Sequence, residues 1–147
     1  MGNVWPQLTD EADIDAAIAG ILSVLRPGGR LVMGLKAFEA RRESGNPYMP
    51  LMRREHEGEP IWFIRFVDFT PTPPIVEMHM IVAKGEDQCV LHRSGRSRSW
   101  SAEELRLRLL AGGFDEVKVS GKLGDPDNVP TGEDVFVHAC GPMPYRE

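Results

Sequence analysis

Apolar residues recur at steps of three and four over residues 9–25, a spacing that predicts one amphipathic helix. Thr9 is the expected N-cap, because its hydroxyl can accept a hydrogen bond from a free amide of the first turn. The Pro-Gly-Gly turn at 27–29 ends the helix, since proline cannot continue it and glycine tolerates a left-handed turn. The apolar run at 30–35 then predicts a short strand with both faces covered. Together they form half of an α/β layer.

The middle of the chain changes to a different pattern. Residues 36–60 are charged and interrupted by glycine and proline, so we expect mostly a loop or lid with a short helical piece at 38–42. Three stretches with strand composition follow, at 61–68, 75–83 and 88–93. Because short turns join them, they predict a three-stranded antiparallel meander.

A second helix is predicted by its end signals. Ser101 and Glu104 have the spacing of a capping box, in which each side chain bonds the other residue's free amide. Trp100 before the cap and Leu105 after it are placed to form a hydrophobic staple. The glycine pair that begins at Gly112 ends this helix.

Two further strands complete the order, at 115–120 and 133–140, separated by a polar loop. The order is helix, strand, lid, three strands, helix, strand, strand. We therefore predict an α/β fold in a single domain, 1–147, with a lid and antiparallel β insertion at 36–99.

Length, charge and cysteine usage narrow the class of protein. A chain of 147 residues can bury a real core, and a formal charge of −5 argues against a nucleic-acid-binding surface. The sequence shows neither a signal peptide nor an apolar run near the roughly 20 residues of a membrane span, so no membrane association is expected. Cys89 and Cys140 lack metal or redox spacing, so we expect two buried thiols in a cytoplasmic protein.

Three local signatures occur in order along the chain. They are Gly2-Asn3 in the N-terminal loop, Leu-Arg-Pro-Gly-Gly-Arg-Leu at 25–31, and Arg-Ser-Trp-Ser-Ala-Glu-Glu-Leu at 98–105, which continues into Leu-Ala-Gly-Gly-Phe at 110–114. In this order they resemble the C-terminal half of a class I S-adenosylmethionine-dependent methyltransferase. The N-terminal loop and the three-strand insertion resemble glycine/sarcosine N-methyltransferases and related small-molecule enzymes most.

The resemblance implies a partial Rossmann-like sheet, S-adenosylmethionine as cofactor and a small-molecule acceptor such as an amine. The family binds its cofactor with a glycine-rich loop after its first strand and an acidic residue that ends the second. Here Gly28-Gly29 and Gly112-Gly113 each follow a helix, so both are helix C-caps. The chain therefore resembles a truncated or split enzyme. The alternative is a non-catalytic binding or assembly module.

Either interpretation predicts a partner. Without the family's first strands, the strand at 30–35 would expose an apolar face and an edge, and such surfaces pair with other chains. We expect a homodimer or a complex with a separate N-terminal half.

The resemblance also implies site residues in the N-terminal loop. Gly2, Asn3 and Val4 would contact the cofactor, and Asn3 would also contact an amino-acid-like substrate, since an amide both donates and accepts. Alternatively, Asn3 is a turn residue that bonds its own backbone. Gln7 stands where the resembled enzymes have a histidine, so the chain departs from the resembled pattern at this position.

Lys36 falls where the resembled enzymes have an arginine that clamps the substrate carboxylate; the alternative is a solvated surface lysine. Trp5 would line the substrate side or stack on adenine, or else belongs to the core. No metal site is predicted, because the histidines are scattered. No catalytic residue is predicted either, since no serine or cysteine has the context of a nucleophile elbow. His79 and His92 lie on neighbouring predicted strands, where they could face one another as a structural pair.

Overall fold

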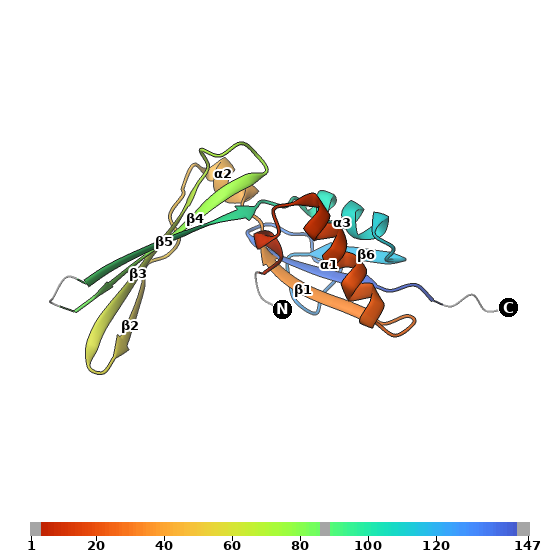
Figure 1. Ribbon diagram of the computed structural model, residues 1–147, viewed down its shortest axis with the longest axis horizontal. Coiled ribbons are helices and arrows are strands. Elements are labelled where there is room, and N and C mark those ends of the chain that lie inside the picture. Colours follow the sequence, from red (N-terminus) through yellow and green to blue (C-terminus); the bar gives the residue numbers. More distant parts are fainter. Residues whose placement is uncertain (1–3, 86–88, 144–147) are drawn as a thin grey trace. The chain divides into compact units, whose positions relative to one another are not determined.

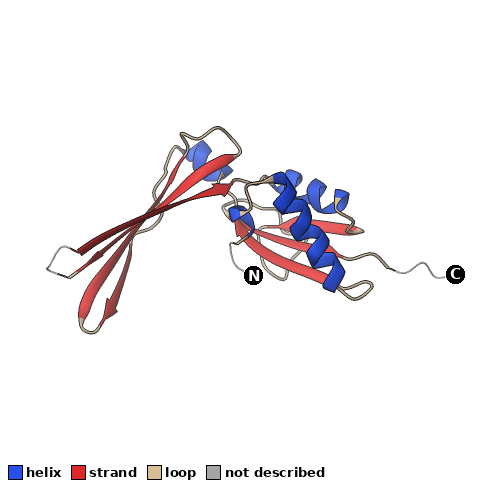
Figure 2. Cartoon of the chain, viewed as in Figure 1, coloured by secondary structure: helices blue, strands red, loops and turns tan. Residues whose placement is uncertain are grey.

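The computed structural model describes residues 4–85 and 89–143, and the chain divides into two compact units. The first comprises residues 1–40 and 98–147 and is called the α/β unit here. The second, residues 41–97, is called the insertion unit. Figure 1 labels the helices and strands of both units, and Figure 2 separates them by type.

The α/β unit contains a three-stranded sheet of order β1-β7-β6. Its strands are β1 (Arg30–Lys36), β6 (Glu116–Ser120) and β7 (Asp134–Cys140). The last strand in sequence lies between the other two and runs antiparallel to both, with Val137 opposite Met33 of β1 and Val119 of β6. All three strands confirm the predicted segments within one residue at each end.

Helices α1 (Glu11–Val24) and α3 (Ala102–Ala111) pack on one face of this sheet. A 3-10 turn, η1 (Trp5–Gln7), precedes α1. One core cluster joins residues of both helices to all three strands: Ile14, Ile18, Leu105, Leu109, Leu31, Met33, Leu35, Val117, Val135 and Val137. Along β1, burial alternates, and Val32 on the other face is 46% exposed. The described residues thus cover one face of β1, which corrects the expectation of two covered faces.

The helix ends follow the predicted capping chemistry with two corrections. Asp10, rather than Thr9, is the N-cap of α1, and its carboxylate accepts from the Ala12 amide at 2.8 Å. Ser101 caps α3 as predicted, accepting from the Glu104 amide at 3.1 Å. The Glu104 carboxylate, however, accepts from the guanidinium of Arg98.

The insertion unit contains a four-stranded sheet of order β2-β3-β4-β5. Its strands are β2 (Met52–His56), β3 (Glu59–Asp68), β4 (Ile75–Lys84) and β5 (Cys89–Arg98), and a short helix, α2 (Glu39–Ser44), precedes them in sequence. The three predicted strands are confirmed as β3, β4 and β5, and α2 confirms the helical piece. The prediction missed β2, which lies in the segment 36–60 that we expected to be mostly loop. The sheet therefore has four strands instead of the predicted three.

β2 forms although its sequence, Met-Arg-Arg-Glu-His, has no strand-like alternation. A two-residue turn joins it to β3, with φ of 54° at Glu57 and 81° at Gly58. Positive φ at both central positions suits the twist of a tight hairpin. The guanidinium of Arg53 lies 5.7 Å from the centroid of the Trp62 ring on the neighbouring strand. Backbone pairing with β3 and this cross-strand contact therefore explain why residues 52–56 form a strand.

A row of rings crosses the insertion sheet. Phe66 and His79 are register partners whose rings stack with centroids 4.7 Å apart. His79 stacks in turn on His92 at 5.3 Å, and His79 Nδ1 lies 3.0 Å from His92 Nε2. The prediction that these two histidines face one another is confirmed.

The sequence analysis also made predictions about membrane spans, metal sites and the two cysteines. No helix among residues 4–85 and 89–143 is long and apolar enough to cross a bilayer. In the same ranges, no three histidine, cysteine, aspartate or glutamate side chains gather as a metal site would require. Cys140 is a half-buried free thiol, whereas the Cys89 side chain lies outside the described residues.

Candidate functional site

The carboxyl end of β1 is the part of the α/β unit where a ligand is expected. In open α/β sheets, ligands bind outside the carboxyl ends of the strands. Lys36 is the last residue of β1, and Ala37 and Phe38 after it are buried in the unit, with 8% and 1% exposure. Glu39 follows them. This strand end therefore presents Lys36 and Glu39 on either side of a buried pair.

Lys36 is held by the neighbouring strand. Its Nζ lies 2.6 Å from Oδ1 of Asp134, its register partner at the start of β7. The Lys36 side chain is 39% exposed. A substrate carboxylate that bound Lys36 would therefore compete with Asp134. Gly2 and Asn3, the other polar candidates, lie outside the described residues.

Trp5 belongs to the core of the α/β unit. It is 5% exposed, and its ring centroid lies 6.2 Å from that of the buried Trp100. Val4 beside it is 56% exposed. Both residues also line a hollow of about 200 Å³, together with Leu8, Ala17, Ile21, Met33 and Gly34. The position of Trp5 thus favours the core interpretation, while one part of its surface still faces a hollow.

This hollow, called the β1 hollow, is lined by Trp5 of η1, by Val4 and Leu8 on either side of η1, and by residues of α1 and β1. Its lining is mainly apolar. Within the described part of the chain, β1 ends the strand order of its sheet and has only β7 as a strand neighbour. A sheet edge with an apolar hollow beside it is a surface on which a further segment can pack.

The β1 hollow does not by itself meet the needs of S-adenosylmethionine. Its lining offers no carboxylate for the ribose hydroxyls. Gly28 and Gly113 have positive φ, of 67° and 110°, but each follows a helix and so cannot cradle a ligand at a helix start. The described residues therefore supply at most a part of such a cofactor site.

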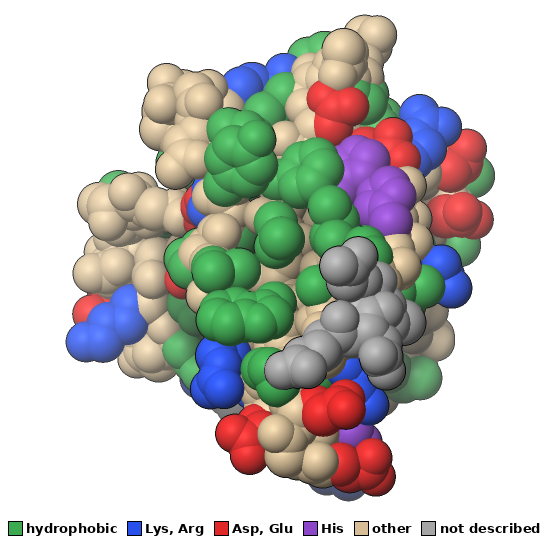
Figure 3. Space-filling view, turned by 90° about the vertical axis from the view of Figure 1, so that its left-hand side faces the viewer, with side chains coloured by type: hydrophobic (Ala, Val, Ile, Leu, Met, Phe, Trp, Pro, Cys, Tyr) green, Lys and Arg blue, Asp and Glu red, His purple; other side chains and the backbone are tan. Residues whose placement is uncertain are grey.

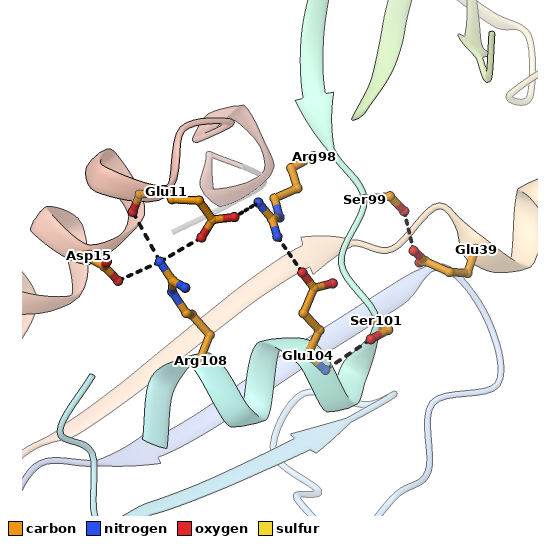
Figure 4. A network of polar contacts seen from close by, with 8 residues as sticks. All are labelled: Glu11, Asp15, Glu39, Arg98, Ser99, Ser101, Glu104 and Arg108. Carbon is orange, nitrogen blue, oxygen red and sulfur yellow. Dashed lines mark hydrogen bonds and ion pairs between the residues drawn. The ribbon is translucent and has the colours of Figure 1, made fainter. Parts of the chain in front are cut away.

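A buried polar pair lies next to Phe38 and was missed by the sequence reasoning. Ser99 Oγ donates to Glu39 Oε1 at 2.6 Å and accepts from the Phe38 amide at 3.3 Å. Ser99 is 3% exposed. The second oxygen of the carboxylate, Glu39 Oε2, is buried and has no hydrogen-bond partner. Figure 4 shows the pair at its right-hand side. In the sequence, Glu39 is one acid in a charged segment, so no local signal singles it out.

A separate ionic network, also drawn in Figure 4, joins the start of α1 to α3. Arg98, whose side chain is 12% exposed, bonds Glu11 at 2.5 Å and Glu104 at 2.6 Å. Arg108 bonds Glu11 and Asp15, each at 2.8 Å. Arg98 is thus part of a structural network.

The network shifts two pKa values in the directions its contacts require. The hydrogen bond from Arg98 lowers the pKa of Glu11, because it stabilises the ionised carboxylate. Burial alone would lower the pKa of Arg98, but the hydrogen bonds that its guanidinium donates to Glu104 and Glu11 outweigh burial and raise that pKa. Both groups are therefore held in their charged forms.

No family model matches the sequence, and no curated protein matches it either. Solved structures do match, among them S-adenosylmethionine-dependent methyltransferases. One is the CcbJ methyltransferase from Streptomyces caelestis, with 15% identity, a TM-score of 0.68 and coverage of 97% of this chain and 55% of that chain. Another is CalS10, an amino pentose methyltransferase from Micromonospora echinaspora, with 21% identity, a TM-score of 0.66 and coverage of 93% and 54%. DesVI from Streptomyces venezuelae has 18% identity and a TM-score of 0.66, with coverage of 97% and 56%.

These matches show the fold. The α/β class and the partial Rossmann-like sheet with an antiparallel insertion are confirmed. The chain spans about 55% of the length of the methyltransferases it matches.

Proposed function

We propose that this chain takes part in S-adenosylmethionine-dependent methyl transfer to a small-molecule acceptor, with an amine as the group that is methylated. The observation that carries the proposal is the match of 93–97% of the chain to methyltransferases with TM-scores of 0.66–0.68. The amine is suggested by two of the similar proteins, an amino pentose methyltransferase and a sugar N-methyltransferase. The particular likeness to glycine/sarcosine N-methyltransferases stays part of the proposal.

The proposed enzyme is incomplete without a further segment. The chain spans about half the length of its matches. Within the part of the chain that the structure describes, β1 has no second strand neighbour on the edge beside the apolar β1 hollow. We propose that an N-terminal half, or a second copy of the chain, packs against this edge in the cytoplasm. A separate N-terminal half would also supply the glycine-rich loop for the cofactor.

Within this proposal, Gly2, Asn3 and Val4 contact the cofactor, and Asn3, Trp5 and Lys36 line the acceptor side. Lys36 supports such a role only if the acceptor replaces Asp134 as its partner. In the complete enzyme, Lys36→Ala and Asn3→Ala should lower kcat/KM for the acceptor. Lys122→Ala, in the loop between β6 and β7, is the matched control. Unchanged kinetics in both site variants would contradict the assignment.

A second candidate is an assembly module that does not catalyse. The same free edge and hollow favour it, because they can hold a partner without any cofactor. Sedimentation velocity tests the partner that both candidates require. Self-association at micromolar concentration supports a homodimer, whereas a stable monomer leaves only a different chain as partner.

Calorimetric titration of the purified 147-residue chain with S-adenosylmethionine separates the two candidates. Saturable micromolar binding would support the enzyme and justify a search for acceptors. Absence of binding, in a chain that circular dichroism shows to be folded, would contradict a cofactor site in this chain alone. The titration would then be repeated with the N-terminal half added, and failure there would leave the assembly module.

A further inference from the structure

The two oxygens of the Glu39 carboxylate have different surroundings. Oε1 accepts a hydrogen bond from Ser99 Oγ at 2.6 Å, whereas Oε2 is buried and has no partner. Burial without a donor is unfavourable for any acceptor and more so for a charged one. Buried polar groups in proteins are nearly always satisfied, so an exception needs an explanation. Either a bound water or a donor group of a ligand would satisfy this oxygen.

The carboxylate is held in a fixed orientation. Ser99 donates its hydrogen to Glu39 and accepts from the Phe38 amide, so its hydroxyl is used in both directions. Phe38 and Trp100, the chain neighbours of this pair, are each 1% exposed. A side chain supported in this way loses little freedom when a ligand binds, which is how binding residues are preorganised.

Glu39 stands just beyond the end of β1. It lies three residues beyond Lys36, the last residue of β1, at the carboxyl end of the strand. This is the edge at which open α/β sheets bind ligands. A structural acid on an exposed helix surface would have both oxygens in water.

We propose that Glu39 Oε2 binds the ammonium or amine group of the methyl acceptor, which makes Glu39 an acceptor-binding residue. This inference rests on the proposed function and names the contact that would hold its substrate. A carboxyl group with one oxygen unpaired selects a donor, and a cationic donor forms the stronger, charge-assisted bond. Ser99 is the positioning residue, because it orients the carboxylate without touching the acceptor.

The test uses ethylammonium chloride as the probe and ethanol as its neutral counterpart of similar size. The whole chain is labelled with ¹³C at the glutamate side-chain carboxyl carbons and titrated at constant ionic strength. The Glu39 resonance, assigned by its loss in Glu39→Gln, should move and saturate with ethylammonium and respond less to ethanol.

Two variants and one control sharpen the test. Isothermal titration calorimetry with ethylammonium compares the variants, because it does not depend on the Glu39 resonance. By this measurement, Glu39→Gln should weaken ethylammonium binding about tenfold, the loss of one charge-assisted bond. Ser99→Ala should weaken it less, because the carboxylate stays but is no longer oriented. Glu43→Gln, an exposed glutamate of the same short helix, should leave binding unchanged. Circular dichroism checks that each variant is folded.

Two results would overturn the proposal. One is a Glu39 resonance that stays fixed while the probe is added, which would assign Oε2 to a bound water. The other is equal binding by Glu39→Gln and the unchanged chain. Neither measurement involves S-adenosylmethionine, so this inference and the proposed function can fail separately.

Discussion

The two units of the chain use different means to become stable. In the α/β unit, two helices lie on a sheet and bury one continuous cluster of apolar side chains. In the insertion unit, Val67 and Val76 are the buried hydrophobic side chains among the described residues. Its sheet instead relies on contacts between neighbouring strands, such as the stack of Phe66, His79 and His92. A layered unit is therefore stabilised by burial, and a single sheet by cross-strand pairs.

The insertion unit leaves much of its apolar surface exposed as a consequence. Exposed large hydrophobic side chains occur throughout it: Tyr48, Leu51, Trp62, Ile64, Met80, Val90 and Leu91. Figure 3 shows hydrophobic side chains gathered beside histidine on the side that carries β2–β5. The comparison of the two units shows that the apolar residues of a segment do not by themselves indicate where the buried core lies.

The largest expected effect compares one leucine from each unit. Leu109→Ala, at 0% exposure, should lower the free energy of unfolding by about 3 kcal/mol, because it leaves a cavity in the α/β core. Leu91→Ala, at 43% exposure, makes the same chemical change in the insertion sheet and should cost less than about 1 kcal/mol. Urea unfolding followed by circular dichroism measures both. Equal losses would refute the difference between the units.

A smaller effect is expected from the ionic network of the α/β unit. Arg98→Met keeps an unbranched apolar stem but removes the guanidinium, which lies over the Trp100 ring and bonds Glu104 and Glu11. Arg108 still bonds Glu11. The variant should lower the free energy of unfolding by about 2 kcal/mol. Thermal unfolding at pH 7 measures the change. Arg106→Met is the control, since its ion pair with Glu103 is on the surface and its loss should not be measurable. An equal response of both variants would show that the burial of Arg98 has no consequence.

The smallest expected effect is the coupling energy between His79 and His92 in the insertion sheet. A double-mutant cycle of His79→Ala and His92→Ala should give a coupling energy of about 0.5–1 kcal/mol, the usual range for cross-strand pairs. The same cycle with His79 and His56, which is exposed on β2, should give none. Additive effects in the first cycle would mean that the stack does not hold the sheet.

Most secondary structure could be predicted because its signals are local. The apolar periodicity predicted α1, and the Ser101 cap and the Gly112 end predicted α3. The choice of Asp10 over Thr9 as N-cap was missed, because both residue types cap well and stand next to each other. β2 was missed because it forms by pairing with β3 and has no alternation of its own.

The candidate site was harder to predict than the fold. Lys36 and Trp5 were found by resemblance, but their partners Asp134 and Trp100 come from distant parts of the chain. Glu39 was not found, because nothing in its neighbours along the chain distinguishes it from other acids.

The sequence by itself determined the order of helices and strands and the α/β class, since periodicity, caps and turns act over a few residues. The tertiary structure decided which polar groups meet. Ser99 and Glu39 are 60 residues apart, and Arg98 and Glu11 are 87 apart. Such contacts depend on how the elements pack, because the sequence separation of two side chains does not determine their distance in the fold. For the same reason, only the packed unit shows that Glu39 Oε2 is buried without a partner.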